Sequence, residues 1–189
     1  ADDEELDAYV NGEKAYVSAQ DGDRTTLTVG YSVPVASGVH GQAVSFLDGS
    51  DVTVSLFADG SAQPKYTVTV PAGEKSGGKY TAVYDIPSVA AGTYTVQVSK
   101  KNHVTREYTV TVGGDVKTLN VEIRLLGDVN GDGRVNAMDC TRLFKHVNKT
   151  QQLTDPYALK CAETNGDGRV NAMDCTRLFK HVNKTQLLW

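Results

Sequence analysis

A stretch of twenty-two residues occurs twice, without a single difference, in the last third of the chain. Residues 130–151 read NGDGRVNAMDCTRLFKHVNKTQ, and residues 165–186 repeat them thirty-five positions later. Packing in a hydrophobic core would preserve only the apolar pattern and would tolerate swaps of similar volume. Because charged and exposed positions are repeated as well, the sequence predicts a pseudo-symmetric module with two equivalent working faces.

Each copy carries the oxygen-ligand spacing of an EF-hand calcium loop. Such a loop has side-chain oxygens at positions 1, 3 and 5, glycine at 6, a backbone carbonyl at 7, a polar residue at 9 and a carboxylate at 12. The candidate ligands of the first loop are Asp128, Asn130, Asp132, Arg134 (through its carbonyl), Asn136 and Asp139. Those of the second loop are Glu163, Asn165, Asp167, Arg169 (through its carbonyl), Asn171 and Asp174. The alternative is a polar turn that binds nothing, but two such loops in register, each followed by a helix, favour two Ca²⁺ ions.

Three details depart from a standard EF-hand. Position 12 is Asp139 or Asp174 where glutamate is usual, so a shorter arm must bring the following helix closer to the metal. Glu163 at position 1 is one methylene longer than Asp128, and the second loop is therefore expected to bind calcium more weakly. Residues 119–125 alternate with the period of a strand, so no helix is expected to enter the first loop.

Residues 127–189 resemble a type I dockerin domain. The resemblance lies in the run DVNGDGRVNAMD followed by the helix CTRLFKHV, in the near-identical second copy, and in the short linking helix between them. It implies a small all-α calcium-binding module with two EF-hand-like loop–helix repeats. Dockerins attach secreted proteins to cohesin modules of scaffoldins, in extracellular polysaccharide-degrading complexes such as cellulosomes and amylosomes.

A helical wheel of residues 137–149 predicts a partner face without reference to the family. It places an apolar stripe in the core, formed by Cys140, Leu143, Phe144 and Val147. Met138 falls on the opposite face among long cationic side chains, which is the setting of an adaptable protein-binding anchor. These cations are Arg142, Lys145 and Lys149, and the face recurs as Met173, Arg177, Lys180 and Lys184. An ordinary solvated helix face is the alternative.

The resemblance implies partner-reading positions that largely agree with this wheel. Carried over, they are Ala137, Met138, Phe144, Lys145 and Lys149, and in the second copy Ala172, Met173, Phe179, Lys180 and Lys184. Phe144 and Phe179 are the exception, because the wheel puts them at the border of the core stripe. Since every position is duplicated, the module is expected to bind one cohesin in either of two orientations.

Between the copies, Asp155 and Pro156 predict the start of a short helix that runs to about Ala162. The apolar chain end predicts a contact of Trp189 with Leu125 and Leu126, with a frayed tail as the alternative. The chain has three cysteines, an odd number that excludes a fully paired disulfide framework. Cys140 and Cys175 are expected to be buried free thiols.

Residues 39–126 predict an all-β sandwich of the immunoglobulin-like or prealbumin-like kind. Seven short alternating runs are separated by turn signals: 42–47, 51–57, 66–70, 80–86, 93–99, 106–112 and 118–124. The run 86–96 resembles the carboxypeptidase-regulatory-like, or prealbumin-like, sandwich. Residues 1–38 contain two further strand-like runs, which either add to the sandwich or remain from an upstream module.

The formal charge of −4 is unevenly distributed. Residues 1–126 carry ten Lys/Arg and sixteen Asp/Glu, whereas residues 127–189 carry nine and seven. A basic module predicts an acidic protein partner. Nucleic acid is disfavoured by the exposed methionines and the acidic chain, and no apolar run reaches the length of about 20 residues that a membrane helix needs. The acidic start is expected to be a mature or trimmed terminus of a secreted protein.

No arrangement of residues in the sequence indicates an active site. His40 and His103 are isolated and are expected at the surface, and the tyrosines at strand spacing favour core packing over a sugar-binding platform. The leading hypothesis is a non-catalytic secreted protein that binds a cohesin in a calcium-dependent way. The alternatives are a polysaccharide-binding component attached through its dockerin, and the non-catalytic tail of a glycoside hydrolase.

Overall fold

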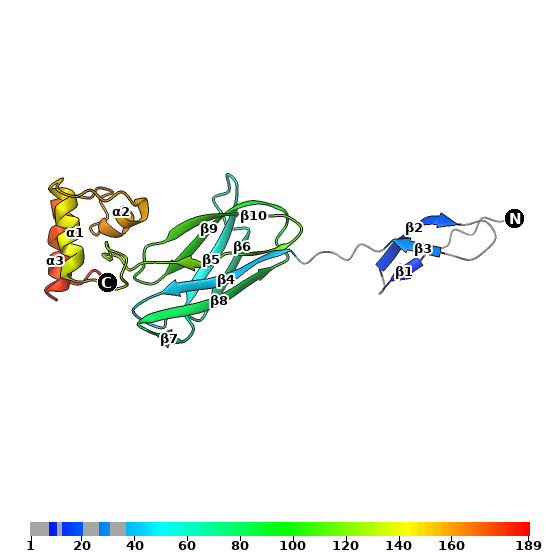
Figure 1. Cartoon of the computed structure of the whole chain (residues 1–189), viewed down its shortest axis with the longest axis horizontal. Helices are drawn as coiled ribbons and strands as arrows, with labels where there is room; N and C mark the ends of the chain where they lie inside the picture. Colours follow the sequence, from blue (N-terminus) through cyan, green and yellow to red (C-terminus); the bar gives the residue numbers. More distant parts are fainter. Residues whose placement is uncertain (1–7, 11–12, 21–26, 31–36) are drawn as a thin grey trace. The chain divides into compact units, whose positions relative to one another are not determined.

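The computed structural model describes residues 8–10, 13–20, 27–30 and 37–189. The chain divides into two compact units, Ala1–Val35 and Ala36–Trp189. In the first unit, three antiparallel strands form a sheet of their own: β1 (Ala8–Val10), β2 (Glu13–Gln20) and β3 (Leu27–Gly30) (Figure 1). The strand-like runs expected near the start of the chain correspond to β2 and β3.

The second unit begins with two sheets packed face to face. One sheet is antiparallel, with strands in the order β10 (Arg106–Val112), β9 (Gly92–Lys100), β5 (Val52–Ala58) and β6 (Tyr66–Val70). The other has the order β11 (Val116–Thr118), β4 (Gly38–Ser45), β8 (Lys79–Pro87) and β7 (Lys75–Ser76), and β12 (Val121–Glu122) also pairs with β4. Both β11 and β12 run parallel to β4, whereas the other pairs are antiparallel.

The alternating runs of the sequence place one face of each strand in the core between the sheets. In β5 and β9, for example, every second side chain is buried: Val52, Val54, Leu56, Tyr94, Val96 and Val98. At about 25 cal/mol per Å² of apolar surface, this interior is the main source of the sandwich's stability. The predicted β-sandwich is confirmed.

The last predicted strand, residues 118–124, is divided in the structure between β11 and β12. Between β11 and β12 the backbone N–H of Leu119 donates to the carbonyl of His40 at 2.8 Å, and its carbonyl accepts from the Tyr84 hydroxyl at 2.5 Å. Gly41 faces this carbonyl with no room for a side chain. The Tyr84 hydroxyl therefore occupies the Leu119 carbonyl between β11 and β12, and the regular strand pairing is interrupted at this point.

Three helices follow the sandwich: α1 (Ala137–Val147), α2 (Pro156–Ala162) and α3 (Ala172–Val182). Asp155 caps α2 by accepting from Tyr157 N, as its sequence predicts. The helices close a second, small core made of Val129, Leu143, Leu153, Ala162 and Leu178. No helix precedes the first loop, where Leu125 pairs with His103 in an isolated bridge, as predicted.

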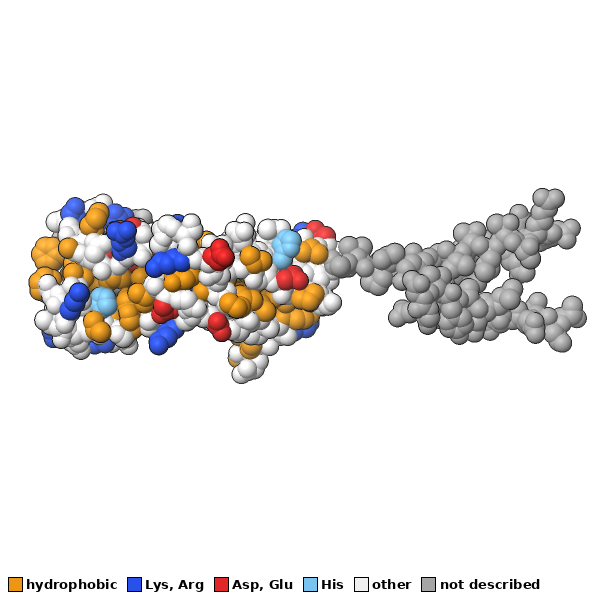
Figure 2. All heavy atoms as spheres, turned by 90° about the horizontal axis from the view of Figure 1, so that it is seen from below, with side chains coloured by type: hydrophobic (Ala, Val, Ile, Leu, Met, Phe, Trp, Pro, Cys, Tyr) orange, Lys and Arg blue, Asp and Glu red, His pale blue; other side chains and the backbone are white. Residues whose placement is uncertain are grey.

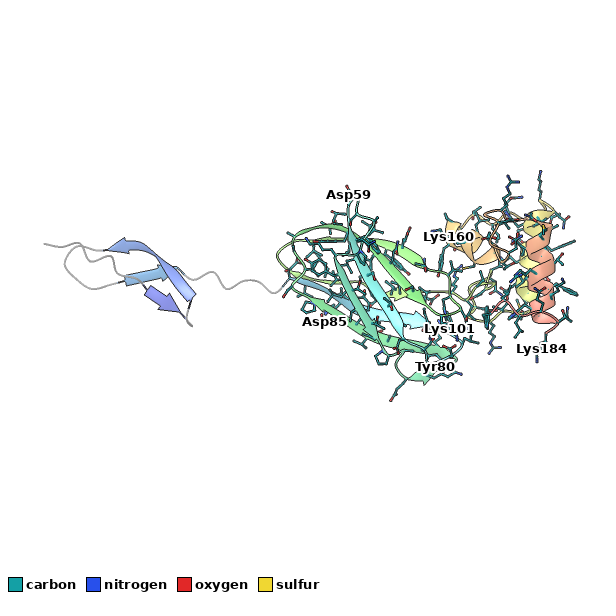
Figure 3. All side chains as sticks on the ribbon, turned by 180° about the vertical axis from the view of Figure 1, so that it is seen from behind. Asp59, Tyr80, Asp85, Lys101, Lys160 and Lys184 are labelled. Carbon is teal, nitrogen blue, oxygen red and sulfur yellow. The ribbon has the colours of Figure 1, made fainter. Side chains whose placement is uncertain are left out.

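The helical part is built directly onto one end of the sandwich. The hydroxyl of Tyr157 on α2 donates to Val104 O at 2.6 Å and accepts from Arg124 N at 2.9 Å. The guanidinium of Arg106 lies 4.5 Å from the centre of the Tyr157 ring. Figure 3 shows Lys101 at the end of the sandwich that meets the helices and Lys184 at one end of α3, which lies crosswise to the sandwich strands.

Candidate calcium loops and partner face

The first loop is organised around the buried side chain of Asp128. Its two carboxylate oxygens accept from Gly131 N at 2.8 Å and from Gly133 N at 3.0 Å. Both glycines have positive φ, 79° and 81°, which a residue with a Cβ adopts only with strain. Asn130 and Asp132 each accept from a backbone N–H two residues further on, so successive side-chain oxygens line the turn.

Asp139 joins the end of this loop to its beginning. One carboxylate oxygen accepts from Val129 N and Asn130 N at 2.9 and 3.0 Å, and the other accepts from Asn136 N at 2.9 Å. The last contact and the Asn136 side chain together form a capping box at the start of α1. The aspartate at position 12 thus draws the helix close to the loop, as its short arm requires.

The second loop repeats these contacts with one difference. Asp174 is fully buried and accepts from Thr164 N, Asn165 N and Asn171 N. Glu163, however, is only half-buried and uses a single oxygen, which accepts from Gly166 N at 2.6 Å and Asp167 N at 3.1 Å. The longer side chain therefore does not reach the glycine at position 6, which Asp128 holds in the first loop.

The loops concentrate carboxylates that lack a cationic partner. Burial raises the pKa of Asp128 to about 6, with nearby Asp139 and Asp132 adding to the rise, and burial also raises the pKa of Asp139. In the described residues no three His, Cys, Asp or Glu side chains gather as a metal cluster by themselves. The available donors are instead a mixture of carboxylate, amide and carbonyl oxygens, which is the donor set that Ca²⁺ takes.

The predicted partner residues are exposed on both repeats. Met138 and Met173 expose 66% and 65% of their surface, and Phe144 and Phe179 expose 62% and 61%. The companion residues Ala137, Lys145, Lys149, Ala172, Lys180 and Lys184 are exposed as well. Figure 2 shows apolar and cationic side chains intermixed on the helical end of the second unit. Phe144 and Phe179 are the only aromatic side chains so exposed in residues 37–189.

The helical wheel was wrong about these phenylalanines. Only Leu143 and Leu178 are fully buried in α1 and α3 among the stripe positions, whereas Cys140 and Val147 are half-buried. Two short helices packed on each other bury a narrow stripe, which leaves the position after each leucine in solvent. The family-implied assignment of the phenylalanines to the exposed face agrees with the structure.

The two repeated helices, α1 and α3, are each followed by a strained lysine. Lys149 and Lys184 have φ of 59° and 57°, a left-handed conformation in which glycine is the usual residue. Thr150 N and Thr185 N then donate back to the carbonyls of Lys145 and Lys180 at 2.9 Å. Glycine would adopt this conformation without the steric strain of a Cβ.

Residues 126–183 match the family model of the dockerin type I domain. We call these residues the dockerin region. No curated protein matches the chain.

Two solved structures are similar to this chain over part of its length. One is a C-terminal interface mutant of the type II cohesin–X-dockerin complex from Acetivibrio cellulolyticus, 22% identical, covering 77% of this chain and 94% of that chain with a TM-score of 0.33. The other is an N-terminal interface mutant of the same complex, 23% identical, covering 77% and 92% with a TM-score of 0.28.

The chain end meets the start of the dockerin region through Leu188 rather than through Trp189. Leu188 packs into the small helical core, and a Cβ on Gly127 would lie 3.0 Å from its side chain. The Trp189 ring lies on His181, with 4.6 Å between the ring centres. The two ends of the module therefore meet through Leu188 and Gly127, whereas the predicted contact was that of Trp189 with Leu125 and Leu126.

The three cysteines are free, and their burial differs from the prediction. Cys161 on α2 is fully buried, and burial raises the pKa of its thiol to about 12. Cys140 and Cys175 are half-buried, because the α1–α3 contact is too narrow to enclose them. Burial raises the pKa of each thiol, which lowers the fraction present as the reactive thiolate.

Two sandwich residues at the junction were not found from the sequence. His103 was expected at the surface, but its Nε2 accepts from Phe46 N at 3.0 Å and its ring is largely enclosed. Phe46 itself is 2% exposed and lies against the first loop. No local signal marks either residue, because the contact joins distant parts of the sequence. His40 is exposed, as expected.

Proposed function

We propose that the dockerin region binds a cohesin module in a calcium-dependent manner. The single observation that carries this proposal is that the matched residues 126–183 contain two loop–helix copies with the same exposed methionine and phenylalanine. Exposed apolar side chains within a ring of lysines suit a protein interface with an acidic partner. The predicted partner residues of both copies are the proposed contacts.

The proposed calcium ligands are the oxygens of the two loops. In the first loop these are Asp128, Asn130, Asp132, Arg134 (carbonyl), Asn136 and Asp139, and in the second Glu163, Asn165, Asp167, Arg169 (carbonyl), Asn171 and Asp174. Ca²⁺ supplies positive charge that offsets the buried carboxylates. Because Asp139 and Asp174 also cap α1 and α3, a neutralised loop holds each partner-reading helix at a fixed angle.

We infer that the chain is a secreted, non-catalytic component of an extracellular polysaccharide-degrading complex, attached through a scaffoldin. The run Ile86–Val96 supports a prealbumin-like class for the sandwich. A polysaccharide-binding role finds less support, because Tyr84 and Tyr94 belong to the sandwich core and the other tyrosines of residues 37–125 are half-buried. No helix of the described residues is long and apolar enough to cross a membrane.

A binding screen tests the proposal. The full chain is titrated calorimetrically against a panel of type I cohesin modules, with calcium and with EDTA, and against soluble glucans and xylan. We expect one cohesin per chain, binding that EDTA abolishes, and no heat with the polysaccharides. The matched control is Val83→Ala, which truncates an exposed apolar side chain on β8 of the sandwich. Binding that survives EDTA, or that requires Val83, contradicts the proposal.

A further inference from the structure

The two loops have the same sequence from position 3 to position 12 but different surroundings. Around Gly166 and Gly168 of the second loop, a built Cβ would meet no atom within 4 Å. At Gly131, a Cβ would lie 2.9 Å from the guanidinium of Arg124, and at Gly133 it would collide with the ring of Phe46. At the glycines, therefore, neighbouring side chains close on the first loop and leave the second loop open, and the internal symmetry of the module is broken there.

Phe46 is held rigidly where it meets this loop. It follows β4, and its backbone N–H donates to His103 Nε2 at 3.0 Å. Its carbonyl accepts from Asp48 N at 3.0 Å and from the buried Lys100 amine at 3.4 Å. Phe46 is 2% exposed, and its ring fills the space into which a Cβ on Gly133, the sharp-turn residue at loop position 6, would project.

Arg124 forms the second contact from the sandwich side. Its Nη1 lies 3.2 Å from a carboxylate oxygen of Asp155, which offsets its charge near the loop. Its guanidinium stacks 5.5 Å from the centre of the Tyr157 ring, and this fixes it over Gly131. The first loop is thus braced at both of its glycines.

We propose that Phe46 is a positioning residue for calcium at the first loop. A flexible loop must be ordered before its oxygens converge, and that ordering lowers the apparent affinity. The Phe46 ring orders the first loop in advance, so this loop binds calcium more tightly and releases it more slowly than the second. The inference rests on the proposed calcium binding. It attributes the difference in calcium affinity between the two loops to a contact that the sandwich makes with only one of them.

Glu163 also distinguishes the loops and must be removed from the comparison. Position 2 differs as well, because Val129 stands where the second loop has Thr164, whose hydroxyl contacts Asp174. In a background with Glu163→Asp and Thr164→Val both loops have the same twelve residues, and any remaining difference comes from their surroundings. Calcium titration of the full chain, followed by the NMR amide signals of Gly131 and Gly166, reads each loop separately. We expect the first loop to bind about tenfold more tightly in this background.

A matched pair of glycine variants isolates Phe46 without deleting it. Gly133→Ala and Gly168→Ala impose the same backbone strain, since their φ values are 81° and 77°, but only Gly133 faces Phe46. Gly133→Ala is expected to lower the calcium affinity of the first loop about tenfold more than Gly168→Ala lowers that of the second loop. Adding Phe46→Ala should remove that excess, and Phe46→Ala alone should weaken the first loop only. The control Val83→Ala should change the calcium affinity of neither loop.

Three outcomes would contradict the proposed role of Phe46. Equal calcium affinities of the two loops in the background with Glu163→Asp and Thr164→Val, equal effects of the two glycine variants, or an equal loss at both loops in Phe46→Ala would overturn it. Thermal unfolding of each variant in saturating calcium identifies a general loss of folding, which would lower both loops together. If neither loop binds calcium in the unaltered chain, the proposed function itself fails, an outcome that the titration distinguishes from equal binding.

Discussion

The hydroxyl of Tyr157 accepts a hydrogen bond from the backbone N–H of Arg124 at 2.9 Å. One residue is on the linking helix α2, and the other leads from the sandwich into the first loop. The same hydroxyl donates to Val104 O at 2.6 Å, so a single oxygen joins the dockerin region to two strand ends.

Tyr157→Phe should therefore weaken the junction. The change leaves a partly buried N–H and a partly buried carbonyl without their partner, which costs about 1–3 kcal/mol of stability. Urea unfolding followed by tryptophan fluorescence, from Trp189, and by circular dichroism measures the effect. Tyr66→Phe is the control, because the Tyr66 hydroxyl accepts only one exposed N–H, from Ala90. A loss no larger than in the control would contradict the role given to Tyr157.

Calcium removal should unfold the dockerin region and leave the sandwich folded. Clustered carboxylates repel one another without the ion, and the helical core is small. Calcium at one hundred times its Kd adds about 2.7 kcal/mol per site. Circular dichroism at 222 nm before and after EDTA checks this, with Asp139→Ala and Asp174→Ala each expected to abolish one site. Helicity and melting that chelation leaves unchanged would refute the prediction.

The duplicated face should make single-face variants nearly silent. Changing Met138, Lys145 and Lys149 to alanine together should lower cohesin affinity by less than about threefold, because the other copy presents the same residues after rotation of the module. The equivalent change at Met173, Lys180 and Lys184 should behave alike, and the combination should abolish binding. Calorimetry with one cohesin measures all three, and loss of binding in either single-face variant would show that only one orientation is used.

Replacing both strained lysines by glycine should separate stability from binding. Glycine adopts the left-handed conformation without the steric strain of a Cβ, but it increases the entropy of the unfolded chain. Lys149→Gly with Lys184→Gly should raise stability by about 0.5–1 kcal/mol while weakening cohesin binding. Thermal melting and calorimetry on the same preparation test both parts, and a stabilised variant with full affinity would remove the lysines from the interface.

Acid should weaken the junction through His103. Burial lowers the pKa of His103 below its usual 6.5, since its Nε2 must stay unprotonated to accept from Phe46 N. The folded state therefore disfavours the charged ring, and the stability contributed by His103 is full above pH 6.5 and is lost as pH falls through the lower folded pKa. Melting temperatures between pH 7 and pH 5 should fall less steeply in His103→Gln than in the unaltered chain. His40→Gln, at an exposed histidine, should keep the original slope.

The parts of the fold that local sequence determines were predicted closely. Asp155 and Pro156 marked the start of α2 because capping and proline geometry act within a few residues. The loops were recognised because their ligands lie within twelve consecutive positions. The exposure of Phe144 was not predicted from the wheel, because it depends on how much of α1 the neighbouring α3 covers. Contacts across long sequence separations, such as Phe46 with Gly133, left no pattern in either segment.

The strand that opens the sandwich and the strand that closes it run parallel to each other. β12 pairs with β4 in register Val121↔Ala43 and Glu122↔Val44, and Ile123 N donates to Val44 O at 3.0 Å. A mechanical pull between the start of β4 and the end of β12 acts along the strands in opposite directions. It loads these hydrogen bonds in shear, so they must rupture together rather than open one by one. A sandwich closed in this way resists being drawn out when its first and last strands are pulled apart along their length.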